Sequence, residues 1–246
     1  MTFLEHLEEL RVRLIHSVIA LVVGFCVCWY FHEKLFRFLT QPLRVAYPDV
    51  EFIFTSPTEA LMLHMKMSFF VGIFVAAPYL LYQVWAFVAP GLYPSEKAYA
   101  VPFIVAGTLF FLGGAAFGHF FLFPLTFRFM VSFGGPGMKF MPRVGEYYSF
   151  YSWFLLGLGA VFQLPVIVFI VARIGLVTPG WLMRNFKYAI LVAFIVAAVI
   201  TPTPDVVTQS MLALPMLGLY LLGVLVAWLF GRPRRVASEA EIEAQA

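Results

Sequence analysis

Three carboxylates lie in segments where they could bind a cation. Glu8 and Glu9 are close to the N-terminus, and Glu96 follows the turn-forming sequence YPS. Single acids have simple structural explanations, because Glu9 and Arg13 have the i,i+4 spacing of a helical ion pair and Glu96 would favour a helix N-terminus. Two acids beside aromatic residues such as Phe87 would also suit a ligand in which a cationic group is followed by an apolar segment. Arginine fits best, since its guanidinium binds a carboxylate through two parallel hydrogen bonds.

A second group of polar residues lies within or beside long apolar stretches. Gln163, in VFQLPV, allows two interpretations: a helix–helix hydrogen bond of about 1 kcal/mol, or a docking point for a polar group on another membrane helix. Residue chemistry alone favours the first. Asp205 is expected to cap the helix that follows it, and Gln209, one turn later, is also able to meet a partner. His16 and His119 are expected near the membrane interface.

Motifs for catalysis and for cofactors are missing from the sequence. It has no G-x-x-x-x-G-K-[ST] loop, no H-E-x-x-H and no G-x-S-x-G, which argues against ATP hydrolysis and familiar protease chemistry. Cys26 and Cys28 are two residues apart on one predicted helix and point to different sides, so they are poorly placed to share a metal. The basic cluster Arg232, Arg234 and Arg235 is too short to indicate nucleic-acid binding. We therefore expect no enzyme, no cofactor, no metal site and no nucleic-acid partner.

The composition indicates a lipid environment. Of the 246 residues, 62% are hydrophobic and 12% are charged, and 29 are phenylalanine. A soluble domain has just under half apolar and roughly a quarter charged residues. A helical span needs about 20 apolar residues, so the chain has room for around six spans with modest loops.

The apolar pattern predicts an all-α membrane protein in which an N-terminal amphipathic helix leads into six transmembrane helices. Residues 1–232 form one membrane domain, and 233–246 are expected to be a disordered cytoplasmic tail. The fifth span is short, because its uninterrupted apolar part, Tyr188–Ile200, would cover roughly 20 Å of a ~30 Å hydrocarbon layer. The predicted spans are about 14–31, 57–88, 99–121, 150–172, 179–200 and 204–230.

Local signals mark two helix starts and two bends. Ser56-Pro57-Thr58-Glu59 has a cap, a proline at the first helical position and a capping-box acid, and Thr178-Pro179 starts another helix. Pro78 and Pro124 are expected to bend the second and third spans. The stretch His32–Thr55 is interpreted as a polar connection.

The distribution of basic residues predicts that both termini are cytoplasmic. Six spans put the two termini on the same side of the membrane. Loops on that side hold nine basic residues, namely Arg11, Arg13, Lys97, Arg173, Arg184, Lys187, Arg232, Arg234 and Arg235. The opposite loops hold six, namely Lys34, Arg37, Arg44, Arg128, Lys139 and Arg143.

Three motifs resemble the TatC family, the large polytopic subunit of the twin-arginine protein translocase. They are HLEELRVRL at 6–14, YQVWAFVAPGLYPSEK at 82–97 and TPTPDVVTQ at 201–209. The order of six spans is similar as well, and the resemblance covers His6 to about Arg232. It implies a multi-pass protein of the bacterial cytoplasmic (inner) membrane that takes part in exporting folded proteins with the proton-motive force.

The resemblance also implies a signal-peptide receptor. By motif position, Glu9 and Glu96 are similar to the acids that receive the paired arginines of a twin-arginine signal peptide, with Arg11, Arg13 and Phe87 in the same cytoplasmic patch. The implied partners are single-span proteins of the TatA and TatB types, which would assemble with several copies of this chain in a hetero-oligomer.

The resemblance extends to further positions, and at two positions this sequence differs from the family pattern. Pro42 matches a family position associated with function, and Asp205 and Gln209 match polar positions near which partner helices dock. Gln163 stands where many relatives carry a glutamate, so hydrogen bonding is kept and titration is lost. Glu8 adds an acid next to Glu9, so the receptor acid need not be Glu9 alone.

A rival interpretation from another class is a small-solute or ion transporter. That class usually has ionisable groups near the bilayer midplane or pseudo-repeated broken helices. The apolar spans contain no Asp or Glu and the sequence shows no internal repeat, so the receptor interpretation is favoured.

Overall fold

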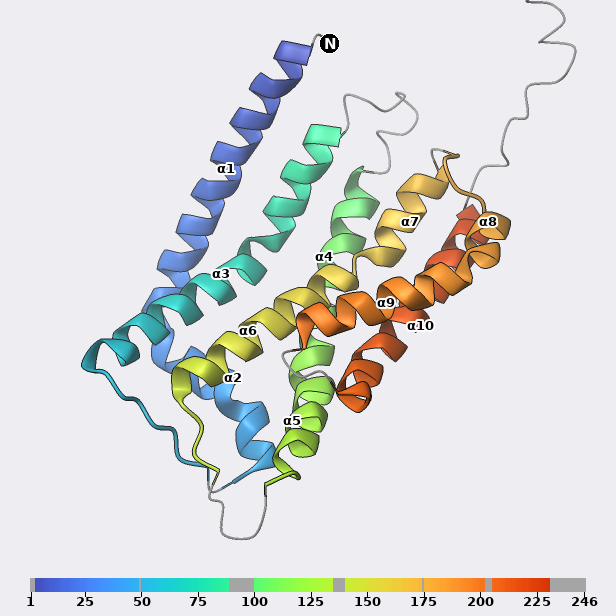
Figure 1. Cartoon of the computed structure of the whole chain (residues 1–246). Helices are drawn as coiled ribbons and strands as arrows, with labels where there is room; N and C mark the ends of the chain where they lie inside the picture. The colour runs from blue at the N-terminus through green and yellow to red at the C-terminus, as the bar shows by residue number, and fades with distance from the viewer. Residues whose placement is uncertain are drawn as a thin grey trace, which may run out of the picture.

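The computed structural model is all-helical (Figure 1). It describes residues 3–48, 50–88, 100–134, 140–173, 175–201 and 205–230. Its helices are α1 (Phe3–Tyr30), α2 (His32–Ala46), α3 (Pro57–Val88), α4 (Ala100–Phe117), the π-helical η3 (Gly118–Leu122), α5 (Phe123–Val131), α6 (Val144–Val161), α7 (Leu164–Arg173), α8 (Pro179–Arg184), α9 (Phe186–Ile200) and α10 (Val206–Phe230). The predicted loop 90–97 and tail 233–246 lie outside these ranges.

The structure confirms the expected set of long apolar helices and one short one. Within the described ranges, five segments are long and apolar enough to cross a membrane: Glu5–Tyr30, Pro57–Phe87, Val101–Val131, Val144–Arg173 and Val206–Leu229. The helix predicted to be short is α9, with 15 residues. The amphipathic N-terminal segment is continuous with the first long helix, as expected.

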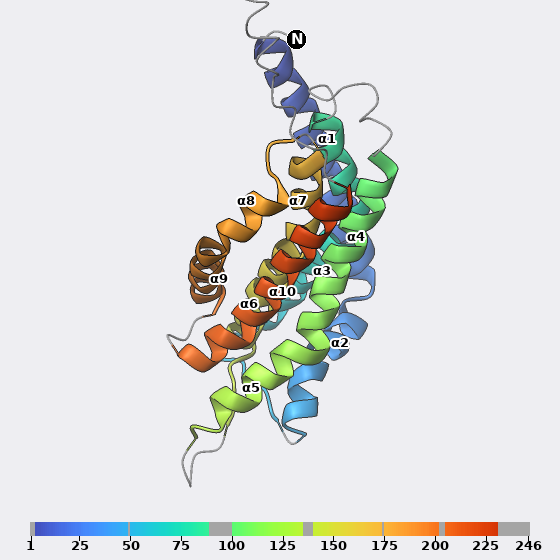
Figure 2. The same cartoon turned by 90° about the vertical axis from the view of Figure 1, so that its right-hand side faces the viewer.

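The helices run between two ends of the molecule. Figure 1 shows the N-terminus of α1 and the C-terminal end of α3 together at the top, which we call the near end. The helices α2 and α5 lie at the opposite end, called the far end. Figure 2, turned by 90°, shows α8 and α9 along one side of the molecule and α2 and α4 along the other.

The helix starts predicted from capping signals are confirmed. The helix α8 begins at Pro179, and the Thr178 hydroxyl accepts a hydrogen bond from the Trp181 N–H at 3.2 Å. Asp205 caps α10 by accepting from the Thr208 N–H at 2.6 Å. The helix α3 begins at Pro57, although its capping acid accepts from Thr55 rather than from the expected residue 56.

One prediction about an irregular segment is wrong. The stretch predicted as a polar connection contains α2, whose inner face buries Leu39, Thr40, Pro42 and Leu43. The fourth span is confirmed as one apolar segment, Val144–Arg173, but it consists of two helices, since α6 ends at Val161 and α7 begins at Leu164. Pro165 has no N–H to offer the carbonyl one turn earlier, which favours a break at this point.

The third span is longer than predicted, and the fifth is divided into two helices. The third does not end near residue 121, since it passes through the π-turn η3 into α5 and reaches Val131. A π-turn inserts an extra residue into the helical ladder. The fifth is broken at Asn185, whose side chain donates to the Trp181 carbonyl at 2.8 Å and ends α8.

The core is an aromatic cluster built around α6. Tyr151 and Phe154 of α6 are fully buried, together with Phe123 of α5, and the Phe123–Tyr151 ring centroids are 5.0 Å apart. His119, which was expected near the membrane interface, is buried within the protein: its Nδ1 lies 2.6 Å from the Tyr151 hydroxyl and its ring stacks on Phe38 at 4.4 Å. Burial among aromatic rings leaves Tyr151 as its polar partner.

The helices α1 and α3 approach each other at a pair of glycines. A Cβ atom added at Gly24 would lie 2.8 Å from the Gly72 carbonyl oxygen, and one added at Gly72 would lie 2.9 Å from the Phe25 nitrogen. Both obstacles are main-chain atoms, which cannot turn away as a side chain does. Small residues at such crossings let membrane helices pack backbone to backbone.

We predict that Gly72→Ala destabilises the protein and that Gly113→Ala does not. The alanine methyl at position 72 has to push α1 away, and overpacking of this kind costs about 1–3 kcal/mol. At Gly113, on α4, a Cβ would meet nothing within 4 Å, so the higher helix propensity of alanine can only help. Thermal unfolding in detergent micelles measures both. Equal midpoints for the two variants would contradict the close approach.

Candidate functional site

The near ends of α1 and α3 form a polar and aromatic surface, which we call the α1–α3 patch: His6, Glu9, Arg13, Gln83 and Phe87. The Arg13 Nη2 lies 3.3 Å from the Glu9 Oε1, and its Nη1 donates to the Gln83 Oε1 at 3.3 Å. His6 and Phe87 stack with ring centroids 4.4 Å apart and planes at 23°. The patch therefore joins α1 to α3 through two contacts, the hydrogen bond from Arg13 to Gln83 and the stacked rings of His6 and Phe87.

Hydrogen-bonding capacity is left over in this patch. The side chains of Glu9 and Arg13 are only 19% and 28% exposed, respectively. The Glu9 Oε2 and the Arg13 Nε are buried and have no hydrogen-bond partner among the described residues. A half-buried carboxylate with one free oxygen is a good acceptor for a second guanidinium, because partial burial strengthens the interaction.

The other predicted receptor residues are placed differently. Glu8 and Arg11 are on α1 and exposed. Glu96 lies outside the described residues. Of the two neighbouring acids, Glu9 is the one linked to α3, through Arg13, which bonds both Glu9 and Gln83. The i,i+4 spacing indicated the pair with Arg13, whereas nothing in the sequence pointed to Gln83, which is distant along the chain.

The residues predicted for partner docking come from three parts of the fold. Gln163, at the α6–α7 break, donates from its Nε2 to the Gly107 carbonyl of α4 at 2.8 Å, which confirms the helix–helix hydrogen bond. Asp205 caps α10, and Gln209, in the first turns of that helix, is half-buried. Pro42 is buried in α2. Gln209 has no side-chain hydrogen bond to any described residue.

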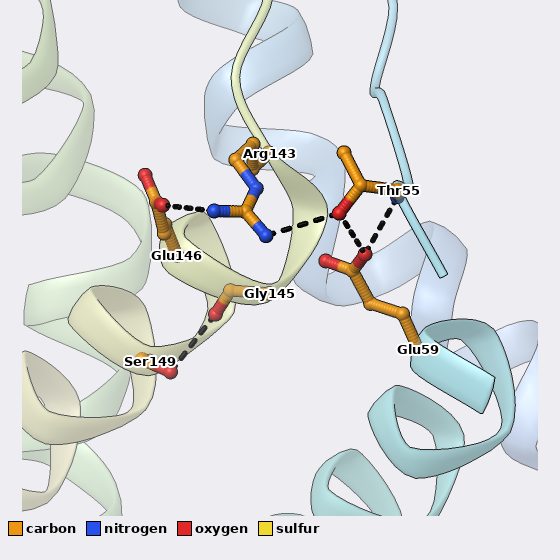
Figure 3. Close-up of polar contacts among 6 residues, drawn as sticks. All are labelled: Thr55, Glu59, Arg143, Gly145, Glu146 and Ser149. Carbon is orange, nitrogen blue, oxygen red and sulfur yellow. Dashed lines mark hydrogen bonds and ion pairs between the residues drawn. The ribbon is translucent and has the colours of Figure 1, made fainter. Parts of the chain in front are cut away.

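At the far end, a polar network that sequence reasoning missed joins the starts of α3 and α6 (Figure 3). Arg143 donates to Glu146 and to the Thr55 hydroxyl, both at 3.0 Å. Glu59 accepts from the Thr55 N–H at 2.7 Å. Main-chain hydrogen bonds connect the two segments, with the Ile53 N–H donating to Pro142 and the Val144 N–H to Ile53.

This far-end network is exposed, so its ion pair adds little stability. The main-chain bonds fix how the segments before α3 and α6 pass each other. We interpret the network as structural. Within the described ranges, no group of three or more His, Cys, Asp or Glu residues is arranged to hold a metal ion.

Comparisons with known proteins agree on one family. Residues 5–215 match the family described as Sec-independent protein translocase protein (TatC). A Sec-independent protein translocase protein TatC from Koribacter versatilis (strain Ellin345) is 42% identical over 251 residues, covering 98% of this chain and 92% of that protein. The protein of the same name from Aquifex aeolicus (strain VF5) is 36% identical over 242 residues, covering 98% of this chain and all of that protein (100%).

Two solved structures are similar throughout. A crystal structure titled as the twin-arginine translocase receptor TatC has 36% sequence identity and a TM-score of 0.79, covering 92% of this chain and 100% of that one. A second, titled as the same receptor in DDM, has 36% identity and a TM-score of 0.80, covering 90% and 99%.

We predict that Gln163→Leu lowers the thermal stability of the protein and that Gln209→Leu does not. Leucine at 163 removes the hydrogen bond to Gly107, at a cost of about 1 kcal/mol in a membrane protein. Leucine at 209 removes no bond within the described chain. The measurement is thermal unfolding of the purified chain in detergent, where only the first variant should have a lower midpoint. A larger loss for Gln209→Leu would mean that this side chain has an internal role.

Proposed function

The chain belongs to the TatC family and is a twin-arginine translocase receptor subunit, not an enzyme, and from this premise we propose that the α1–α3 patch binds the paired arginines of a signal peptide. The observation that carries the proposal is the half-buried Glu9, which has one carboxylate oxygen held by Arg13 and the other without a partner. An incoming guanidinium takes the free oxygen once the groups that bury it move aside. Arg13 and Gln83 keep the carboxylate in place against α3.

The charge balance of the patch requires a second acid. Arg13 already neutralises most of the charge on Glu9, so Glu9 alone is a weak site for two guanidinium groups. Glu96 supplies the second negative charge by its position in the family motif. Glu8 is the alternative, and its exposure on α1 makes it the less favoured one, because water and salt screen an exposed charge.

The aromatic part of the patch suits the apolar segment of a peptide that carries the arginines. The stacked rings of His6 and Phe87 lie on the same two helices as the charged pair. They offer an apolar surface to a hydrophobic continuation of the peptide and a π face to a guanidinium. Arg11 is exposed beside the patch and adds positive potential at the membrane surface.

We further propose the arrangement in the membrane and the partners. The chain is a multi-pass protein of the bacterial inner membrane with the near end and both termini in the cytoplasm. TatA- and TatB-type single-span proteins assemble with several copies of it, and the proton-motive force drives export of folded proteins. Gln209 is the favoured contact for a partner helix because its side chain is not used internally, with Asp205 and Pro42 marking the same far end. Gln163 is less suited to this role, because its side chain already donates a hydrogen bond to the Gly107 carbonyl.

We predict that Glu9→Gln and Glu96→Gln each weaken the binding of an arginine-pair signal peptide. A hydrogen bond to a charged group contributes about 1.5–3 kcal/mol, so loss of one acid should weaken binding roughly ten- to 150-fold. Higher salt moves the effect towards the lower figure. Peptides with a lysine pair should bind less tightly, since an ammonium lacks the planar fork. Peptide titrations of purified protein in detergent, at two salt concentrations, measure these differences.

The matched control is Glu146→Gln, which removes an exposed, ion-paired acid at the far end and should leave binding unchanged. If the Glu9→Gln, Glu96→Gln double variant binds at wild-type strength and still prefers arginines to lysines, the site lies elsewhere. A loss seen only with Glu8→Gln would place the receptor acid one residue earlier on α1.

We also predict that both termini are inaccessible from outside the cell. In a background without Cys26 and Cys28, single cysteines at Glu5 and Ala240 should resist a membrane-impermeant thiol reagent in intact cells and react after lysis. A cysteine at Glu146, in the exposed far-end network, should react in intact cells. Labelling of positions 5 or 240 from outside would reverse the proposed orientation.

A further inference from the structure

A groove in the membrane-embedded part of the protein has an unusual lining. It lies between α1, α3 and α6 and has a volume of about 650 Å³. Its walls are mostly apolar, with Phe25 from α1, Phe69 and Ile73 from α3 and Leu156 from α6. A lysine, Lys66, is the one cationic residue in its lining.

The groove belongs to the far half of the helices. Phe25 is close to the end of α1 at Tyr30, and Ser149 and Ser152 follow the start of α6 at Val144. The α1–α3 patch is at the other end of the same helices. The groove is therefore separate from the proposed receptor site.

Lys66 has no anionic partner among the described residues. Its main chain is held in place, because the Tyr148 hydroxyl of α6 donates to the Lys66 carbonyl at 2.7 Å. Its side chain is exposed on a helix that is otherwise apolar enough to span a membrane. An ammonium in hydrocarbon costs several kcal/mol, so such a side chain extends to the interface or pairs with an anion.

The hydroxyl groups of the two serines in the lining are both used as donors within α6. Ser149 donates its hydroxyl proton to the Gly145 carbonyl and Ser152 donates to the Ser149 carbonyl. Their oxygens can accept, but they have no free proton for an anion. Lys66 is therefore the donor that an anionic group in the groove would find.

A tryptophan marks the interface level in the same groove. Trp153 lines it and donates from its indole Nε1 to the Val199 carbonyl, at the last turn of the short helix α9, at 3.2 Å. Tryptophan favours the headgroup level of a bilayer. The helix α6 begins at Val144, so Trp153 lies more than two turns inside it, and α9 ends at that level. On this face the apolar surface is therefore shorter, and polar headgroups have to come deeper than elsewhere.

From these observations we propose that the groove binds an anionic phospholipid, with its phosphate at Lys66 and an acyl chain along Phe25, Phe69 and Ile73. The charge of Lys66 selects an anion, and the apolar walls require a chain attached to it. A volume of about 650 Å³ is in the range of single small-molecule sites, whereas a transmembrane helix about 10–12 Å in diameter needs a longer and wider surface.

The test uses the purified full chain in a neutral detergent. Native mass spectrometry compares binding of phosphatidylglycerol with that of phosphatidylcholine carrying the same acyl chains. The wild-type protein should bind its first phosphatidylglycerol about tenfold more tightly, and Lys66→Gln should abolish this preference. The matched control is Lys34→Gln, which removes another far-end lysine that lies over the Phe31 ring, outside the groove, and should keep the preference.

A second measurement places the lipid. Phosphatidylglycerol with brominated acyl chains should quench Trp153, so the quenching seen in the wild-type protein should be smaller in Trp153→Phe and in Lys66→Gln. Equal binding of the two lipids, or an unchanged preference in Lys66→Gln, overturns the proposal. Competition by inorganic phosphate as strong as by the lipid would indicate a simple anion site. Displacement of the lipid by a synthetic apolar single-span helix, unaffected by Lys66→Gln, would make the groove a helix-docking surface.

Discussion

A main-chain carbonyl in lipid has no water to accept from, so wherever a helix ends, bends or breaks, another donor must be found within the protein. Side chains of this protein donate to main-chain carbonyls of neighbouring helices. Some of these carbonyls lie in the last turn of a helix, whereas those of Lys66 and Gly107 lie in the middle of one, where it is the donor side chain that needs a partner away from water. The pairs between described residues are Tyr147 to Leu39, Tyr148 to Lys66, Trp153 to Val199, Gln163 to Gly107, Tyr220 to Leu182 and, at the exposed far end, Arg128 to Val45. The carbonyls of Leu182 and Val199 lie in the last turns of their helices.

The helix α6 supplies three of these donors, from two adjacent tyrosines and Trp153, and they reach α2, α3 and α9. One helix thereby sets the positions of three others, and its buried ring, Tyr151, also meets His119 of η3. Lipid tails are as apolar as the side chains, so there is little hydrophobic driving force between membrane helices, and they associate largely through van der Waals packing and hydrogen bonds. Directional bonds from α6 therefore add specificity to an aromatic core that could otherwise pack in several ways.

The sequence predicted local features well and distant pairings poorly. Caps at Thr178 and Asp205 were predictable because a cap involves residues within one turn. The pair Glu9–Arg13 follows from helical spacing, whereas its third member, Gln83, comes from another helix.

The missed helix α2 has a related cause. Its apolar residues do recur with helical spacing, as at Leu35, Leu39 and Leu43, but the charged residues between them make the segment polar overall, and Pro42 inside it is a signal against a helix. The tertiary contacts of that face, including the Tyr147 bond to Leu39, outweigh the local preference. In the same way, Gln163 was correctly expected to bond another helix, but nothing in the sequence identified Gly107 as its acceptor.

The helix pair α1–α3 connects the two proposed binding regions. At the near end Arg13 reaches Gln83, and towards the far end the groove is formed by Phe25 and Phe69 with α6. Between them the backbones touch at Gly24 and Gly72, leaving no side chain to absorb a relative movement of the two helices. A packed contact of this kind moves as a unit, because dense interiors transmit displacement instead of damping it. If the proposed peptide binds across α1 and α3 at the near end and the proposed lipid binds between them at the far end, both act on the same helix pair, whose spacing is limited by the contact of the two glycines.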